Sequence, residues 1–597
     1  MPTWQQLRDA KFTEYERAAD GWSTVSNRSD AARTRADQEM AGPLRATQKG
    51  EAQTSAERDL TQLGRNYQYL HSECGLVRTA LNALASELSA AQKKLKQALD
   101  DAADLEFTVN EDGSVEYPRS ADLPLAPRTS SGTGVAKSGA PVPYLPGAGE
   151  ADGDPNKGEA EDIAERISQA VTSATETDNR YAKILRELKA PDGLVVTDDM
   201  LLDEAHDMGD VQKTVGTYLG KDSIPHGRSP VANRTWWDGL TQEEREEYQT
   251  LYPAEIGALD GIPSVVRDSS NRIVLDESRV QVKSELDALG PEPSKTVVTA
   301  GGVMRNPEWT AWQAMGGGRL KGQLDGMKAI QARLDQTGID GLPPAYLLGF
   351  DTKDNGHAIV ANGNPDTADN TAVYVPGTKS KLAGAEGDIR RMTRVWKEAN
   401  SMSVSQSTST ITWIGYDAPQ SITPEAMEKH WAYEGAPKLN NFLDGLQTVQ
   451  GGPDASHTTV IGHSYGSTTV GAASKASGHF AADDIVVAGS PGMLVGDASD
   501  LDVGKSHVWS EAASDDLVPL GGKVAHLGGY KWGVQTFHGL PYDAGYVQTV
   551  PSDEAFDAHR MHVDTSGHSG YWDEDKDSLK NQAAVVVGRY DKVQEDH

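Results

Sequence analysis

One serine of the chain stands where a nucleophile could be made. Ser464 lies in Gly-His-Ser-Tyr-Gly (462–466), directly after the β-branched run Thr458–Ile461 and before small residues at helical spacing. Strand, tight turn and helix form the context of a nucleophile elbow, in which the serine backbone is strained. Gly462 and Gly466 suit this turn because a Cβ at either position would collide with neighbouring backbone. We therefore predict that Ser464 is a catalytic nucleophile.

A nucleophilic serine needs a base that takes its proton and an acid that orients the base. With this elbow, the acid and then the histidine follow the serine along the chain. Two adjacent aspartates, Asp515 and Asp516, stand in the expected place after the strand predicted at 505–511. Counting back from Val518-Pro519 favours Asp515, whereas an Asp-x-Val pattern favours Asp516. The residues alone leave both open.

The base must come from the histidines after the acid, which are His526, His538, His559, His562 and His568. His568 lies in a glycine-flanked loop before the helix predicted at 578–584, where such a histidine belongs, and we predict it as the base. His559-x-x-His562 has a spacing that could bind metal, but no third ligand accompanies it. We expect surface histidines there, and we expect neither a metal nor a cofactor.

Backbone N–H groups must hold the oxyanion that forms during acyl transfer. One should belong to Tyr465, directly after the nucleophile. The other should come from Val-Pro-Gly-Thr (375–378), after a predicted strand, where Gly377 allows close approach and the N–H of Gly377 or Thr378 is the candidate. The same four residues also suit an ordinary Pro-Gly turn.

Alternating strands and helices surround these residues. Strands are predicted at 345–350, 358–361, 371–375, 410–415, 458–462, 484–489 and 505–511, with helices at 383–399, 424–451 and 468–476. This order is typical of a doubly wound, mostly parallel α/β sheet, with Ser464 near its centre.

The region before the sheet is predicted to be all-α. Residues 3–106 carry two apolar stripes, one before and one after Gly42-Pro43, which indicate a hairpin of two long helices packed through their stripes. Pro, Gly, Ser and Ala dominate the stretch that follows and suggest a tether. The predicted domains are a helical hairpin (1–125), a flexible linker (126–158), a helical connector (159–227), an extension that packs on the sheet (228–300) and the catalytic domain (301–597).

The composition excludes several classes of function. The chain has 597 residues and a formal net charge of -32, which argues against a nucleic-acid or anionic-membrane partner. Cys74 is the only cysteine, so no intramolecular disulfide and no cysteine-based zinc site is expected. The N-terminus lacks the features of a signal peptide, and no apolar stretch is long enough to span a bilayer. By default we expect a cytoplasmic protein.

Several motifs together resemble one family. Gly-His-Ser-Tyr-Gly-Ser (462–467), Val-Pro-Gly-Thr (375–378), Gly-Ser-Pro-Gly (489–492), the Asp-x-Val loop and Gly-His-Ser-Gly-Tyr (567–571) are similar to actinobacterial α/β-hydrolases of the "domain of unknown function" type. The run 257–275 is similar to the N-terminal extension of that family. The resemblance implies the α/β-hydrolase fold with Ser464 as nucleophile, His568 as base and Asp516 as acid, and it implies no substrate.

The N-terminal hairpin loosely resembles helical proteins of the Trp-x-Gly type VII secretion class. It departs from them because no Trp-x-Gly stands at the turn between its helices. Tyr69-x-x-x-Glu73 fits the Tyr-x-x-x-Glu secretion pattern, a match that chance also produces in an acidic chain. Leaderless export by such a route, and a protein partner of the hairpin, are therefore alternatives to the default.

The function that follows is a serine hydrolase that cleaves an ester, thioester or amide of a small-molecule or lipid-like acyl substrate through an acyl-enzyme. Two alternatives use the same residues differently. An acyltransferase would pass the acyl group to an alcohol. A secretion-linked or partner-binding protein would keep the hydrolase-like domain with little turnover.

Overall fold

The chain folds into two compact units. The computed structural model describes residues 2–119, 133–139, 154–189, 193, 195–216, 218–299, 302–477, 480–537 and 540–596, with only the backbone at 476–477, 533–537 and 540–544. One unit comprises Met1–Ala31, Tyr67–Val195 and Asp203–Ser223, and the other comprises Ala32–Asn66, Val196–Leu202 and Ile224–His597. Most of the linker predicted at 126–158 lies outside the described residues.

The first unit is mainly helical, as predicted. Its helices are α1 (Trp4–Asp9), most of α2 (Thr13–Arg35), α4 (Glu51–Asp104) from Tyr67 onward, α5 (Pro155–Glu187) and most of α6 (Asp198–Val215). A hairpin of β1 (Thr108–Val109) and β2 (Val115–Pro118) follows α4, and β3 (Thr133–Ala136) extends it to a small antiparallel sheet. No helix in the described part of the chain combines the length and the apolar character needed to cross a bilayer.

The two predicted apolar stripes differ in outcome. In the stripe after Gly42-Pro43, Leu81, Leu84, Leu88 and Leu95 are buried in α4, whereas Leu60, Leu63, Leu70 and Leu99 are partly buried. Helix α2 instead buries the small residues Ala19, Ser26 and Ser29 and exposes Tyr15, Trp22 and Val25, so the stripe predicted there is wrong. Ser26 explains the choice of face, because its hydroxyl donates to the His71 carbonyl over 2.8 Å, which requires a small polar residue inside.

The predicted helix break is also displaced. Gly42-Pro43 does not end a helix: a π-helical turn (Ala36–Ala41) leads directly into α3 (Gly42–Thr47), with proline in the first turn, where its missing N–H costs nothing. The chain leaves the helix only at Gln48, and Gly50 has a positive φ before α4 begins. The helix therefore ends at Thr47, and Gly50 belongs to the turn that leads into α4.

An eight-stranded sheet forms the centre of the second unit, in the order β15-β12-β11-β10-β8-β9-β7-β6. The pairs from β15 through β9 are parallel, and β7 pairs antiparallel with both β9 and β6. The strands are β6 (Ala345–Asp351), β7 (His357–Asn362), β8 (Asn370–Val375), β9 (Thr408–Ile414), β10 (His457–His463), β11 (Asp484–Ala488), β12 (Val508–Glu511) and β15 (His559–Arg560). The predicted mostly parallel sheet is confirmed.

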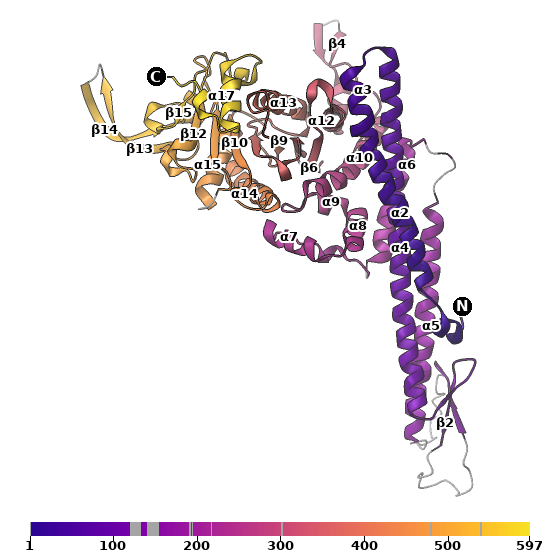
Figure 1. Cartoon of the computed structure of the whole chain (residues 1–597). Helices are drawn as coiled ribbons and strands as arrows, with labels where there is room; N and C mark the ends of the chain where they lie inside the picture. Colours follow the sequence, from indigo (N-terminus) through magenta and orange to yellow (C-terminus); the bar gives the residue numbers. More distant parts are fainter. Residues whose placement is uncertain are drawn as a thin grey trace. The chain divides into compact units, whose positions relative to one another are not determined.

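Alternate residues of each strand feed two cores. On β8, Ala372 and Tyr374 face one apolar cluster, and Val373 and Val375 face the other. Helices α13 (Ala385–Met402) and α17 (Asp577–Val586) cover the first face, and α14 (His430–Gln450) and α15 (Tyr465–Ser477) cover the second (Figure 1). The carboxyl ends of the parallel strands are therefore left to loops.

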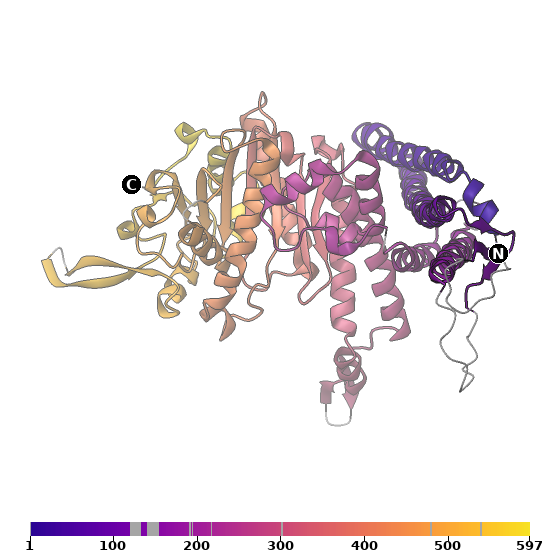
Figure 2. The same ribbon diagram turned by 90° about the horizontal axis from the view of Figure 1, so that it is seen from below.

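Further helices pack around the sheet, and two hairpins were not predicted. The helices are α7 (Pro230–Gly239), α8 (Gln242–Leu251), α9 (Pro253–Gly257), α10 (Ser264–Ala288), α11 (Pro307–Ala314), α12 (Gly317–Leu334) and α16 (Val518–Val524). The hairpins are β4 (Thr296–Thr299) with β5 (Gly302–Arg305), and β13 (Gly529–Phe537) with β14 (Leu540–Thr549), the latter projecting as an arm (Figure 2). A capping box of Thr241 and Glu244 opens α8.

Candidate active site

Ser464 occupies the sharp turn between β10 and α15. Its φ is 53°, in the left-handed region that non-glycine residues rarely adopt. The strain is held by backbone contacts: the N–H of Ser464 donates to the Ala488 carbonyl over 3.0 Å, and its carbonyl accepts from the Ser467 hydroxyl over 2.6 Å. The geometry is that of the nucleophile elbow expected from the sequence.

The glycines on either side of Ser464 have no room for a side chain. A Cβ on Gly462 would lie 2.7 Å from Cα of Ser467, and one on Gly466 would lie 2.0 Å from the Val375 carbonyl oxygen. Helix α15 therefore starts in direct backbone contact with β8. That contact places the start of the helix, with its partial positive charge, beneath Ser464.

Asp516 and His568 form a hydrogen-bonded pair at the carboxyl ends of the parallel strands, the end at which Ser464 also lies. The Nδ1 of His568 lies 2.8 Å from Oδ2 of Asp516, whose side chain is only 1% exposed. Two further groups donate to this carboxylate, the Tyr571 hydroxyl over 2.6 Å and the Val518 N–H over 2.9 Å. Burial alone would raise the pKa of Asp516, but the bonds from His568, Tyr571 and Val518 hold that pKa below its usual value. The carboxylate is therefore charged and its position is fixed.

Asp515, the other candidate acid, points elsewhere. It is exposed, and its Oδ1 accepts the N–H of Gly567 over 2.7 Å. This bond ties the loop that carries His568 to the loop that carries Asp516. Adjacent aspartates thus make different contacts: Asp516 holds the imidazole, and Asp515 holds the backbone next to it.

His463, which the sequence analysis did not single out, supports His568 from inside. It is buried, and burial lowers its pKa well below the usual value, so the ring is neutral. Its Nε2 lies 2.9 Å from the backbone carbonyl oxygen of His568, which can only accept, so Nε2 carries the proton. Its Nδ1 lies 3.4 Å from the Tyr374 hydroxyl, to which Arg391 donates over 2.8 Å; Arg391 also pairs with Asp388. His463 occupies the second position of the Gly-x-Ser-x-Gly motif, which does not specify a residue there, so the motif could not predict this role.

The loop after β8 lies directly over the nucleophile. A Cβ on Gly377 would lie 2.7 Å from Cβ of Ser464 and 2.8 Å from the Tyr465 nitrogen, so only glycine fits between them. The Tyr416 hydroxyl donates to the Pro376 carbonyl over 2.8 Å and fixes the loop. Thr378 follows on the cavity wall. The backbones of Gly377 and Tyr465 thus lie close together, and Thr378 lines the same cavity.

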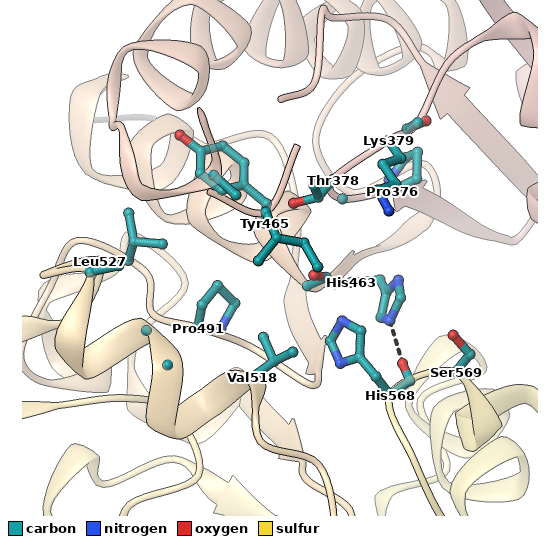
Figure 3. Close-up of a pocket in the computed structure, with 18 of the residues that line it drawn as sticks. Pro376, Thr378, Lys379, His463, Tyr465, Pro491, Val518, Leu527, His568 and Ser569 are labelled. Carbon is teal, nitrogen blue, oxygen red and sulfur yellow. Dashed lines mark hydrogen bonds between the residues drawn. The ribbon is translucent and has the colours of Figure 1, made fainter. Parts of the chain in front are cut away.

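A cavity of about 880 Å³ opens above these groups, within the size range of small-molecule sites. Ser464, Tyr465, His463 and His568 all line it. In Figure 3 the rings of His463 and His568 lie side by side, with Tyr465 and Thr378 across the cavity from them. Of the predicted site residues, Ser464, His568, Tyr465, Gly377 and Thr378 line this cavity, and Asp515 and Asp516 do not.

The other histidines considered as bases are engaged elsewhere. His526 lies 3.1 Å from the Tyr530 hydroxyl, and His559 and His562 lie 3.2 Å and 2.9 Å from carboxylate oxygens of Glu595 and Asp596. His538 lies outside the described residues. Across the part of the chain that the structure describes, no cluster of three or more His, Cys, Asp or Glu residues could hold a metal ion.

Comparison with known proteins agrees with this fold. Residues 351–527 match the model of an alpha/beta hydrolase family; the matched region contains Ser464 and Asp516 and ends before His568. With the sheet order and the elbow, this match identifies the α/β-hydrolase fold, preceded by long N-terminal helices.

Two proteins of Mycobacterium tuberculosis are similar to the chain, and both are described only as uncharacterized: Rv2079 of strain H37Rv and MT2140 of strain CDC 1551. Each is 30% identical over 396 residues, which cover 62% of this chain and 58% of the relative. The chain thus spans less than two thirds of the length of these relatives. No solved structure matches the chain.

Proposed function

We propose that the chain is a serine hydrolase that cleaves an ester, thioester or amide through an acyl-enzyme on Ser464. The observation that carries this proposal is that His568, bonded to Asp516 at 2.8 Å, lines the same cavity as a serine held at a φ of 53°. A strained serine and an oriented imidazole that line one cavity are two of the groups that acyl transfer requires.

The proposed first step begins at the ring nitrogen that Asp516 leaves available. With Nδ1 of His568 bonded to Asp516, Nε2 takes the proton of Ser464 as its Oγ attacks the acyl carbon. The resulting oxyanion accepts from the Tyr465 N–H and from the N–H of Gly377 or Thr378. Nε2 then returns the proton to the leaving group, which departs and leaves the acyl-enzyme.

In the second step water attacks the acyl-enzyme, with His568 again taking and then returning a proton. The charged Asp516 stabilises the imidazolium formed in each step without accepting its proton. Replacing this water by an alcohol would give acyl transfer with the same residues. The groups described here use no metal or cofactor.

The proposal is tested by labelling the full-length protein with a fluorophosphonate, which reacts with activated serines. We expect one label, on Ser464, and we expect Ser464→Ala to lose the label and to lower kcat on a small ester by about 10⁶-fold. Ser514→Ala is the matched control, because it removes a hydroxyl from an exposed position of the acid loop. Unlabelled wild-type protein, or turnover that survives Ser464→Ala, would reject the proposal.

A further inference from the structure

The short helix after the acid has its polarity reversed. Helix α16 follows Asp516, and Leu517, Leu520 and Val524 are 75%, 64% and 70% exposed, although they recur at the spacing of one helix face. A surface helix ordinarily turns its apolar stripe inward. Here the inward face carries Pro519 and Gly522 instead.

The inner face of α16 is fixed by backbone contact. A Cβ on Gly522 would lie 1.7 Å from the carbonyl oxygen of Pro491, so no side chain can stand between the helix and that loop. The helix therefore cannot turn Leu520 or Val524 inward without losing this contact. The exposure of Leu517, Leu520 and Val524 therefore follows from the way α16 packs against the loop that carries Pro491.

A second segment adds exposed apolar side chains to the wall of the cavity. Ile422 and Met427, between β9 and α14, are 68% and 41% exposed, and both line the cavity. Leu517 and Val524 line it as well. These four residues and Leu520 form what we call the apolar rim. Exposed apolar patches of this kind mark binding surfaces.

The interior of the cavity has two sides. Leu527, Pro491 and Val518 lie together on one side in Figure 3, and Thr378, Lys379 and Ser569 lie on the other. The apolar side is continuous with the apolar rim, because Val518 belongs to α16. An aliphatic chain that entered from the rim would follow apolar side chains toward Ser464.

We infer that the substrate is an ester of a long aliphatic acid, taken from the surface of an aggregated lipid without net charge. This inference rests on the proposed function. The cavity wall from α16 to Leu527 would hold the acyl chain, and the apolar rim would dock on the lipid surface. An anionic surface does not fit, because the chain carries a net charge of -32 and the lysine of α16, Lys523, is paired with Asp553 at 2.7 Å.

The acyl part is tested with p-nitrophenyl esters from acetate to octanoate, each kept below its solubility limit. Each methylene buried in an apolar site contributes about 0.8 kcal/mol, so kcat/KM should rise about fourfold per added methylene until the apolar wall is filled. A flat or falling series, with acetate turned over normally, would overturn the inference and leave the hydrolase proposal standing.

The rim is tested with tributyrin, below and above the concentration at which it forms an emulsion. We expect wild-type turnover to rise steeply once the emulsion forms. The triple variant Leu517→Gln/Leu520→Gln/Val524→Gln should lower the ratio of emulsified to dissolved turnover at least about tenfold, since three apolar side chains leave the interface. Val404→Gln is the matched control, because Val404 is 85% exposed at the opposite end of the sheet and should leave the ratio unchanged.

A replacement variant and a binding measurement distinguish failure of this inference from failure of the proposed function. If the triple variant fails to fold, the single variant Leu520→Gln replaces it, because Leu520 stands outside the cavity wall and should still lower the ratio. Binding is measured by cosedimentation of full-length Ser464→Ala with vesicles of dioleoylphosphatidylcholine or of dioleoylphosphatidylglycerol, and should favour the former. An unchanged ratio with normal fluorophosphonate labelling overturns the inference, whereas loss of labelling in the wild type overturns the proposed function.

Discussion

The two ends of the central sheet each hold an aspartate bonded to histidine, and the histidine at the carboxyl end lines the cavity described above. At the carboxyl ends of the strands, Asp516 binds His568 at 2.8 Å. At the opposite end, Asp484 begins β11 and lies 3.2 Å from Nε2 of His457 and 3.1 Å from Nδ1 of His507. The same chemical pair thus occurs at both ends of one sheet.

At the amino end of the sheet, several neighbouring side chains donate hydrogen bonds to the Asp484 carboxylate. The Tyr590 hydroxyl and the Trp509 indole N–H also donate to Asp484, over 2.6 Å and 2.9 Å, and its side chain is fully buried. Burial alone would raise the pKa of Asp484, but hydrogen bonds from His457, Tyr590 and Trp509 hold it below its usual value. Every contact of this carboxylate joins strands and the C-terminal segment together.

The difference between the two ends lies in what surrounds the histidine. Nε2 of His457 lies near both Asp484 and the Val585 carbonyl oxygen, and Nδ1 lies 3.7 Å from a carboxylate oxygen of Asp483, so both ring nitrogens face acceptors within the protein. His568 instead uses one nitrogen for Asp516 and lies on the cavity with Ser464. A buried aspartate–histidine pair therefore indicates chemistry only together with a strained nucleophile and an open space.

The comparison predicts its largest effect at Asp516. Asp516→Asn removes the charge that stabilises the imidazolium and favours the wrong tautomer of His568, so kcat on a small ester should fall about 10⁴-fold. Steady-state kinetics on the full-length protein measures this loss. Asp515→Asn is the matched control: it keeps an oxygen for the Gly567 N–H and should change kcat less than about threefold. The reverse ranking would assign the acid to Asp515.

The second prediction moves the same substitution to the other end of the sheet. Asp484→Asn breaks a buried charged cluster and should lower the free energy of unfolding by about 3–5 kcal/mol, as measured by urea denaturation. The fraction that stays folded should keep its kcat, because no group of the cluster lines the cavity. A loss of kcat that matches the Asp516 variant would remove the distinction between the two ends.

The stabilising effect of Asp484 should depend on pH in a defined direction. Although burial lowers the pKa of His457, Asp484 raises that pKa above the usual value. The contribution of protonated His457 to the free energy of unfolding is therefore complete below about pH 6.5 and is lost as the pH rises through the raised pKa. The lowered pKa of Asp484 makes its own part complete above about pH 3.9, and it is lost as the pH falls through that lowered pKa. The difference in unfolding free energy between wild type and Asp484→Asn should therefore be largest between about pH 4 and pH 6.5.

The elements that position the site were predictable because their signals are local. The strand before Ser464 and the glycines around it follow from β-branched residues and from the turn that the serine needs. The choice between Asp515 and Asp516 did not follow from the residues, since it depends on which carboxylate meets a loop 52 residues farther along the chain.

Helix α10 shows why other elements were missed. Its buried residues include the polar Asp268 and Asn271, which bind the backbone of Leu347 in edge strand β6: Asp268 accepts from its N–H over 2.7 Å, and Asn271 donates to its carbonyl over 3.0 Å. Polar residues on the inner face weaken the apolar period on which helix prediction depends. The role of His463 was hidden for a related reason, because its partner is a backbone carbonyl and leaves no mark in the sequence.

A smaller effect is expected from the residue that supports His568 from inside. His463→Phe leaves the His568 carbonyl without its buried donor, which costs about 1–3 kcal/mol in placement of the imidazole and should lower kcat about 10- to 100-fold. His463→Gln keeps a donor and should recover part of the loss. Because His463 is neutral, the pH profile of kcat should keep its shape in the variants that turn over. A fall in thermal stability with unchanged kcat would show that His463 only packs.

The smallest effect on turnover should come from removing the residues before Arg228. Every hydrogen bond described here at either end of the sheet joins residues after position 370. A chain of 228–597 should therefore keep both pairs and hydrolyse a small ester within about twofold of the full-length rate.

The shortened chain would lose α3, which lies so close to Gly338 that a Cβ on Gly338 would be 2.7 Å from the Gly42 carbonyl oxygen. It would also lose the Asp198–Lys283 ion pair. We expect this loss to lower Tm by several degrees, as measured by circular dichroism. The full-length variant Lys283→Gln separates the ion pair from the rest, since a half-exposed pair contributes about 0.2–1 kcal/mol. Soluble 228–597 protein that no longer labels at Ser464 would show that the N-terminal residues help to shape the site.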